Sequence, residues 1–336
     1  MEHRSLGRAG LKVPSLCLGA MTVGETTDGF MKGVASPDKE AARVLDTCIE
    51  RGVNFIDTAD VYGNGRSEEL LGQLLEGRRD KVLLATKCRF TMGPTPNDVG
   101  LSRKHILQAC EASLKRLKTD YLDLYQVHMQ DRSVPIEETL RALDDLVTQG
   151  KVRYVGCSNY AGYRLVESLW AADRRATTRY ESVQLQWNLA CRDAEREVIP
   201  ACRTFGVGVL VWSPLARGFL TGKYKRGEAP PAGTRLAEWK DTWAKVATEQ
   251  AWTVIDVVRK VAERRSTTPA AVSLRWLLDR PEVSSVIIGA RTIAQLEDNL
   301  ACLTVKLTDE DRVDLDKASK PDWGYPYDFI GGREVW

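Results

Sequence analysis

Hydrophobic and polar residues alternate along the chain in two patterns. Short apolar runs bounded by Gly or Pro are separated by longer segments in which apolar residues recur at helical spacing. The short runs predict β-strands, and the longer segments predict amphipathic helices. The expected strands are Ser15–Ala20, Asn54–Thr58, Val82–Thr86, Leu122–Val127, Val152–Gly156, Ser182–Gln186, Val207–Val211 and Val283–Ile288.

The segments between these strands carry the marks of helices. Leu140 and Leu143, for example, lie on one apolar face at a spacing of three residues. Ser67, Ser102 and Thr308 stand where helices are expected to start, because their side chains can accept hydrogen bonds from the first free backbone N–H groups. The pattern is therefore a repeated alternation of strand and helix.

Eight strands followed by helical segments predict an α/β fold, a (β/α)8 TIM barrel formed by residues 1–336 as one domain. Every crossover is long enough for the helix that parallel strands require. A doubly wound sheet is the competing architecture, but no strand is followed by the Gly-x-Gly-x-x-Gly motif that binds a dinucleotide in that fold. An N-terminal β-hairpin is expected to precede the barrel, between Arg4 and Pro14.

Three connections are longer than linking requires, and loops of this length usually carry function. They are Thr22–Ala35, Arg89–Leu101 and Ala216–Glu249, and we expect them to extend from the C-terminal face of the barrel. The C-terminal tail, residues 321–336, holds several aromatic residues, Trp336 among them. It either covers apolar surface or forms a wall of a pocket, and the sequence leaves both roles open.

Composition and charge narrow the class of partner. The chain has 48 Lys and Arg against 46 Asp and Glu, so its charge gives no footprint for nucleic acid or an anionic membrane. Eight scattered cysteines without a Cys-x-x-Cys pair predict reduced core thiols rather than disulfides, and no metal site. No signal peptide or membrane span is expected. The sequence therefore predicts a cytoplasmic protein with a small-molecule partner, and leaves the oligomeric state open.

Titratable side chains stand where several predicted strands end, which is where the active site of a TIM barrel lies. Asp57 ends the second strand, Tyr62 follows it, Lys87 ends the third and His128 ends the fourth. Buried Lys87 requires a counter-ion, and Asp57 is the candidate. The ammonium would lower the pKa of the Tyr62 phenol from about 10. Tyr62 could then protonate a developing alkoxide, while His128 orients the oxygen or shares the proton.

Taken singly, each of these residues has a structural explanation. Asp57 could cap a helix or pair with Lys87 as a salt bridge, Tyr62 could be a loop aromatic, and His128 could be a core histidine. Together they would require four coincidences at one barrel mouth. The combination therefore favours a catalytic site.

The chain resembles the aldo-keto reductase superfamily, and is similar to its long-loop branch of bacterial enzymes and channel β subunits. The resemblance covers almost the whole chain in order. It rests on the motifs Asn-Phe-Ile-Asp57-Thr-Ala-Asp-Val-Tyr62-Gly, Thr-Lys87, Gln-Val-His128, Gly-Cys-Ser158-Asn159, Gln184-Leu-Gln-Trp-Asn-Leu, Trp212-Ser-Pro-Leu-Ala-Arg-Gly and Ile-Gly289-Ala-Arg291. It implies a barrel that binds NADP(H) without a Rossmann motif.

The resemblance also implies the roles of individual residues. The catalytic tetrad of the family corresponds to Asp57, Tyr62, Lys87 and His128. Met21 stands where many relatives carry an aromatic residue. The cofactor-binding positions correspond to Met21, Asp57, Ser158, Asn159 and Gln184 near the nicotinamide, Trp212 stacked on its ring, Ser213, Pro214, Leu215, Ala216, Arg217, Lys223 and Arg235 around the pyrophosphate, and Gly289, Arg291, Gln295, Asp298 and Asn299 at the adenosine end.

Three functions remain to be compared. The leading one is a NADPH-dependent oxidoreductase that reduces an aldehyde or ketone, and Arg291 at a predicted helix start favours the 2′-phosphate of NADPH over NADH. The alternative is a regulatory subunit that binds NADP(H) with little turnover, but such relatives typically carry Asn in place of His128. A metal-dependent sugar isomerase would need a carboxylate and histidine cluster that the sequence lacks. The expected pocket walls are Thr22–Ala35, Arg89–Leu101, Trp187 and the aromatic tail. The substrate and the reaction direction stay open.

Overall fold

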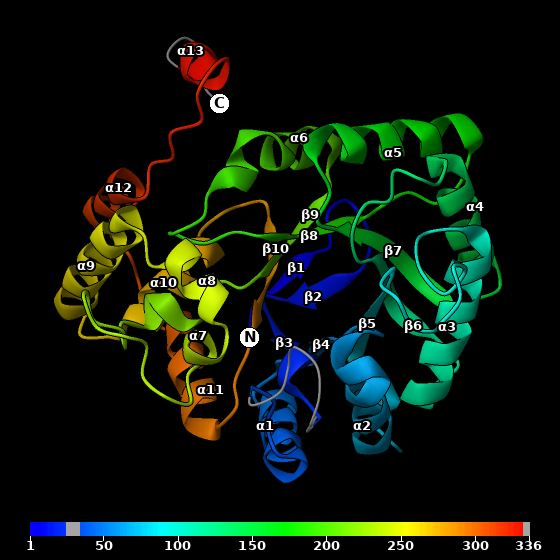
Figure 1. Cartoon of the computed structure of the whole chain (residues 1–336), viewed down its shortest axis with the longest axis horizontal. Helices are drawn as coiled ribbons and strands as arrows, with labels where there is room; N and C mark the ends of the chain where they lie inside the picture. The colour runs from blue at the N-terminus through cyan, green and yellow to red at the C-terminus, as the bar shows by residue number, and fades with distance from the viewer. Residues whose placement is uncertain (25–33, 332–336) are drawn as a thin grey trace.

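The computed structural model describes residues 1–24 and 34–331. Eight parallel strands close into a barrel, and helices surround it (Figure 1). All eight predicted strands are present to within two residues at each end, which confirms the TIM barrel. The strands are β1 (His3–Ser5) and β2 (Lys12–Pro14) in the hairpin, and β3 (Leu16–Gly19), β4 (Phe55–Asp57), β5 (Leu83–Cys88), β6 (Leu122–Val127), β7 (Val152–Ser158), β8 (Ser182–Gln186), β9 (Gly208–Trp212) and β10 (Val283–Ile288) in the barrel.

Helices follow the strands in the order that the apolar spacing predicts. The α-helices are α1 (Asp38–Glu50), α2 (Arg66–Leu74), α3 (Arg103–Leu117), α4 (Ile136–Thr148), α5 (Gly162–Arg175), α6 (Val198–Phe205), α7 (Arg235–Glu238), α8 (Lys240–Val246), α9 (Glu249–Arg264), α10 (Pro269–Leu278), α11 (Ile293–Leu300), α12 (Asp309–Ala318) and α13 (Tyr327–Gly331). The 3-10 helices are η1 (Ala20–Thr22), η2 (Tyr62–Gly65), η3 (Arg79–Lys81), η4 (Asp193–Arg196), η5 (Ala216–Thr221) and η6 (Ala301–Leu303).

Two of the three predicted helix starts are caps. The side chains of Ser102 and Thr308 accept backbone N–H groups at the starts of α3 and α12. Ser67 instead lies inside α2, where its hydroxyl is 2.9 Å from the Thr58 hydroxyl and donates to the Ala20 carbonyl at 2.8 Å. The Ser67 hydroxyl therefore links α2 to the segments that follow β3 and β4, and it does not cap a helix.

The antiparallel hairpin β1–β2 closes the N-terminal end of the barrel. Leu6 and Val13 have no exposed surface and pack with Phe55 inside the barrel. Gly7 has φ of +59°, and a Cβ there would lie 2.6 Å from the Glu181 carbonyl oxygen. Only glycine accommodates both the backbone conformation and this close approach, so Gly7 allows the hairpin to seat.

The barrel interior changes from apolar to polar along the strands. Phe55 precedes Asp57 on β4 by two positions, and Leu124 precedes Gln126 on β6 by the same interval. Phe55 and Leu124 belong to the interior apolar cluster, whereas Asp57, Gln126 and Lys87 are buried polar residues one layer higher. Because side chains alternate with a period of two along a strand, these polar groups face the same interior.

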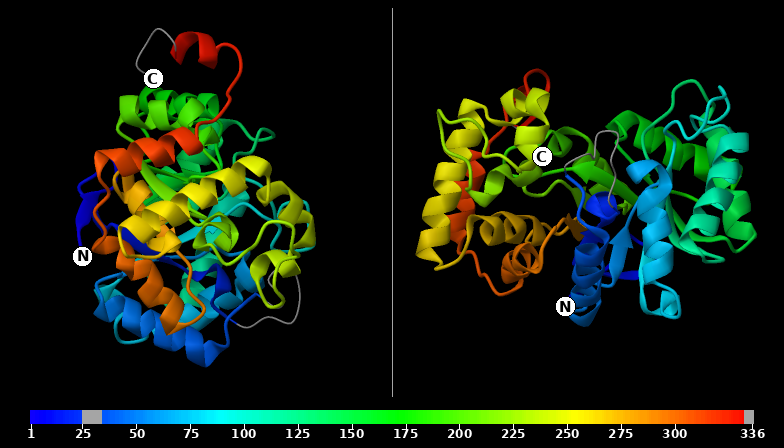
Figure 2. Two further views of the ribbon diagram at one scale, coloured as in Figure 1. Left: turned by 90° about the vertical axis from the view of Figure 1, so that its left-hand side faces the viewer. Right: turned by 60° about the horizontal axis from the view of Figure 1, so that its bottom comes forward.

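The long connections differ in structure. The predicted loop Ala216–Glu249 contains η5, α7 and α8, which fold over the C-terminal face. The predicted loop Thr22–Ala35 falls largely on residues 25–33, and Trp336 also lies outside the described residues. Beyond α12 the chain leads to α13, which stands away from the barrel near α6 (Figures 1 and 2).

Seven of the eight cysteines are buried, and Cys191 is partly exposed. Burial raises the pKa of the thiols, for example that of Cys48 to about 12, so they pack as neutral core residues. Among the helices of residues 1–24 and 34–331, none is long and apolar enough to cross a membrane.

Candidate active site

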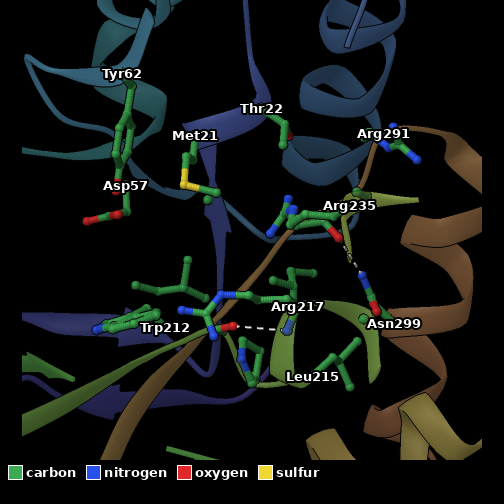
Figure 3. Close-up of a pocket in the computed structure, with 18 of the residues that line it drawn as sticks. Met21, Thr22, Asp57, Tyr62, Trp212, Leu215, Arg217, Arg235, Arg291 and Asn299 are labelled. Atoms are coloured by element: carbon green, nitrogen blue, oxygen red, sulfur yellow. Dashed lines mark hydrogen bonds between the residues drawn. The ribbon is translucent and has the colours of Figure 1, made fainter. Parts of the chain in front are cut away.

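A cavity of about 780 Å³ opens at the C-terminal ends of the barrel strands. All the predicted cofactor contacts line it except Ala216, the first residue of η5, which is buried in the hydrophobic core. Of the four predicted catalytic residues, Asp57, Tyr62 and His128 line the cavity, and Lys87 lies wholly buried behind them. Tyr62 and Asp57 lie on one side of the cavity, and Arg235 and Arg291 lie on the other (Figure 3).

The Lys87 ammonium contacts three oxygen atoms. Its Nζ donates to Asp57 Oδ2 at 2.6 Å, to the Thr58 carbonyl at 2.8 Å and to the Tyr62 hydroxyl oxygen at 3.3 Å. A lysine ammonium has three N–H donors and no acceptor, so Tyr62 accepts in this contact. The phenol proton of Tyr62 is therefore not used in the contact with Lys87.

The electrostatics at Tyr62 differ from the sequence expectation. Burial alone would lower the pKa of Lys87, but Asp57 and Tyr62 raise it, so the amine is an ammonium. Burial also raises the pKa of Tyr62; Lys87 acts in the opposite direction, and Asp57 partly cancels that effect. The net pKa of Tyr62 is raised, because burial outweighs the effect of the lysine charge, which Asp57 also weakens.

His128 holds no proton that it could donate as an acid near neutral pH. Burial, followed by the charges of Lys87 and Arg89, lowers the pKa of His128 well below 6.5. Its ring is edge-on to those of Tyr62 and Phe90, with centroids at 5.8 and 4.9 Å. A neutral imidazole can still orient an oxygen by hydrogen bonding, so Tyr62 is the better acid of the two.

The sequence interpretation missed Gln126, and it placed Phe90 only within the predicted wall segment Arg89–Leu101 without singling it out. Phe90 lines the cavity beside His128 and follows Lys87 by three residues, so its place just after the strand was an available signal. Gln126 donates from Nε2 to Asp57 Oδ1 at 3.0 Å. The alternation of Leu124 and Gln126 along β6, continued by His128 just after the strand, was the signal for its inward direction.

Asn159 joins three strand ends at the cavity. Its Nδ2 donates to the His128 carbonyl at 2.9 Å and to the Ser158 hydroxyl at 3.0 Å. Its Oδ1 accepts from Trp212 Nε1 at 3.2 Å. The amide therefore fixes the Trp212 indole relative to the loop that carries His128.

Positive charge gathers at the other end of the cavity, on Arg217, Lys223, Arg235 and Arg291. In the part of the chain that the structure describes, none of these four forms an ion pair. Burial, followed by repulsion from Arg291, lowers the pKa of Arg235 to about 10. Arg291 also donates from Nη2 to the Gly233 carbonyl at 3.0 Å. Arginine and lysine side chains without a carboxylate partner can bind the phosphate groups of a ligand.

The structure contradicts the expectation for Trp187 and bears on the two roles that were left open for the C-terminal tail. Trp187 is only 2 % exposed and packs edge-on to Trp276 in the core, so it is not a cavity wall. Among the described tail residues 321–331, none lines the cavity. The Tyr327 hydroxyl donates to Glu197 beside α6, and Tyr325 is 87 % exposed, so this part of the tail neither walls the pocket nor buries Tyr325 against the barrel.

Comparisons with known proteins agree with this architecture. The sequence profile described as the Aldo/keto reductase family matches residues 15–320. The chain is 38% identical over 312 residues to a probable voltage-gated potassium channel subunit beta of Arabidopsis thaliana, covering 91% of this chain and 92% of the relative. It is 39% identical over 321 residues to the uncharacterized oxidoreductase YrpG of Bacillus subtilis (strain 168), covering 92% of this chain and 93% of the relative.

A fungal enzyme extends these similarities. The chain is 34% identical over 338 residues to the versiconal hemiacetal acetate reductase of Aspergillus parasiticus, covering 93% of this chain and 95% of the relative. The family match over nearly the whole chain coincides with the barrel and with a cavity built from its strand ends. The chain belongs to the aldo/keto reductase family and is an oxidoreductase built on a TIM barrel.

Proposed function

We propose that this protein uses NADPH to reduce an aldehyde or ketone to an alcohol, with Tyr62 as the general acid. The observation that carries this proposal is the contact of Lys87 with the Tyr62 oxygen at 3.3 Å. Because Lys87 can only donate, that contact leaves the phenol proton for a ligand in the cavity. The raised pKa of Tyr62 keeps this proton in place at neutral pH until an acceptor develops negative charge.

The residues that line the cavity fit a phosphorylated nicotinamide cofactor. Arg217, Lys223 and Arg235 would hold its phosphate groups, and Arg291 would hold the 2′-phosphate. Trp212 offers an aromatic plane for the nicotinamide ring. Bound NADPH would supply a hydride to the carbonyl carbon.

The tetrad then handles the proton. Tyr62 donates its proton to the carbonyl oxygen as negative charge develops there, and Lys87 stabilises the phenolate that remains. Asp57 holds Lys87 in place as an ion pair at 2.6 Å. His128, neutral and edge-on to Tyr62, orients the carbonyl oxygen without competing for the proton.

The test is NADPH oxidation, followed by its near-ultraviolet absorbance, over a broad panel of aldehydes and ketones, with NADH in parallel. Tyr62→Phe removes the proton donor and keeps the ring. We expect kcat to fall by about 10²- to 10⁴-fold while the Kd for NADPH, measured by fluorescence titration, stays the same. Turnover in Tyr62→Phe equal to that of the parent would show that another group supplies the proton.

The similarity to a probable channel subunit beta supports a second candidate, a subunit that binds NADP(H) and regulates a partner with little turnover. The complete tetrad, with a neutral His128 beside Tyr62, favours the enzyme. Tight NADPH binding without oxidation by any carbonyl of the panel would favour the regulatory subunit instead.

A further inference from the structure

The Asp57 carboxylate receives three hydrogen bonds in the barrel interior. Lys87 Nζ donates to Oδ2 at 2.6 Å, while Gln184 Nε2 and Gln126 Nε2 donate to Oδ1 at 2.8 and 3.0 Å. Asp57 is only 2 % exposed, so water contributes little to its solvation. A carboxylate buried to this degree stays charged only where protein donors replace water.

Gln126 reaches Asp57 from near the C-terminal end of β6. It is the register neighbour of Lys87 on β5 and of Gly156 on β7. A Cβ at Gly156 would lie 2.6 Å from Ser182 Oγ but would make only an ordinary contact, at 3.4 Å, with Gln126 Cγ, so Gly156 is required by Ser182 and not by the amide side chain. Gln184 Nε2 also lies 3.4 Å from Gln126 Oε1, which favours the orientation in which Gln126 Nε2 faces the carboxylate.

Packing alone does not require an amide at this position. Gln126 has no exposed surface, and one layer below it on β6 the barrel is filled by Leu124 and its apolar neighbours. A buried amide is costly unless its donors and acceptors are met, and an apolar residue of similar length would fill the same space. The hydrogen bond to Asp57 is what the amide adds.

We propose that Gln126 is a positioning residue of the reaction, whose amide N–H holds the Asp57 carboxylate and thereby sets the contact of Lys87 with Tyr62. The inference rests on the proposed function. Gln126 does not line the cavity formed by the described residues, so it acts through Asp57 and not on the ligand. Removing its N–H leaves the negative charge of Asp57 less compensated, which favours the protonated phenol over the phenolate at Tyr62.

The test compares Gln126→Met with the parent enzyme. Met keeps the length of the side chain and removes the donor. In alcohol oxidation with NADP⁺, where Tyr62 must first lose its proton, we expect the pH of half-maximal kcat to rise by about half a unit. In carbonyl reduction at saturating NADPH we expect kcat to fall about two- to threefold, the factor that half a unit in the Tyr62 pKa allows, because the phenolate that forms is less stabilised. The KM for NADPH should not change.

Gln186→Met is the matched control. Gln186 lies at the end of β8, and over the described residues it has no hydrogen bond to Asp57. Its substitution should leave both pH profiles unchanged. Equal profiles for the parent and Gln126→Met would overturn the proposal, as would an equal shift in Gln186→Met. Gln126→Leu removes the same donor with a different shape and takes the place of Met if that variant does not fold.

The inference can fail separately from the proposed function. The ionisation of Tyr62 can be measured without turnover by titrating tyrosinate absorbance in the parent and in Gln126→Met. The contribution of Tyr62 is the difference between each protein and the same protein carrying Tyr62→Phe. If no carbonyl is reduced but the Tyr62 titration still moves upward in Gln126→Met, the positioning role stands and the proposed reaction falls. If carbonyls are reduced and the titration does not move, the positioning role falls alone.

Discussion

Asp60 is a buried acid beside the tetrad whose ionisation should control stability. It follows β4 by three residues, has no exposed surface, and its carboxyl oxygens have no hydrogen-bond partner among the described residues. Burial, and next the charge of Glu68, raise the pKa of Asp60 to about 8. The folded protein therefore keeps this carboxyl protonated where the unfolded chain ionises it.

The sign and size of the effect follow from linkage between folding and proton binding. The folded pKa is raised above the unfolded value of 3.8, so folding takes up a proton between the two values. Stability falls as pH rises through that window, by about 1.4 kcal/mol per pH unit, and levels off above about pH 8. At pH 7 the cost is about 4 kcal/mol. Asp60→Asn keeps the shape of the side chain and removes the titration.

Urea unfolding of the parent and Asp60→Asn at pH 5, 6, 7 and 8 measures this difference. We expect the variant to gain stability relative to the parent by about 1.4 kcal/mol for each pH unit up to about pH 8. Asp120→Asn, which changes an exposed carboxylate, is the control and should show no such trend. If the free energy of unfolding changed equally with pH in the parent and in Asp60→Asn, the reasoning would be refuted. Equal pH dependence would show that Asp60 binds no extra proton in the folded state.

Three further predictions test the cofactor end and the frame of the barrel. Arg291→Met should raise the KM for NADPH about 10- to 100-fold and leave that for NADH unchanged, because one charge-assisted contact is lost; equal changes for both cofactors would exclude a 2′-phosphate contact. Arg265 and the Thr308 cap overcome burial and lower the pKa of Asp311, so Asp311→Asn should lower stability in urea unfolding above about pH 4, and the loss should fade below that pH. Gly7→Ala should lower the free energy of unfolding by about 1–3 kcal/mol, since its backbone is left-handed and its Cβ would clash; an unchanged value would mean that the hairpin moves without cost.

Much of the fold could be predicted from sequence because its signals are local. The strands Leu122–Val127, Ser182–Gln186 and Val283–Ile288 were predicted at their observed bounds, since apolar runs and turn residues act over a few neighbours. The mouth of the barrel was also predictable, because parallel strands place their last residues at one end. Asp57 and Lys87 are thus 2.6 Å apart although 30 positions separate them.

The errors concern quantities that depend on distant residues. The pKa of Tyr62 was expected to be lowered by Lys87, but burial raises it, and Asp57 weakens the effect of that lysine. Trp187 was expected in the pocket, but it packs on Trp276 from a helix far along the chain. Neither burial nor packing partner can be inferred from a residue and its sequence neighbours.

The sequence by itself determined which side chains stand at the strand ends, since period-two alternation and turn chemistry are properties of short segments. Only the tertiary structure decided how these groups act together. It brought the Gln126 amide into hydrogen-bonding distance of Asp57 and directed one N–H of Lys87 to the Tyr62 oxygen. It also lowered the pKa of His128, so that its imidazole is neutral. Each of these outcomes depends on distance and on exclusion of water, which arise only when the eight strands close around a common interior.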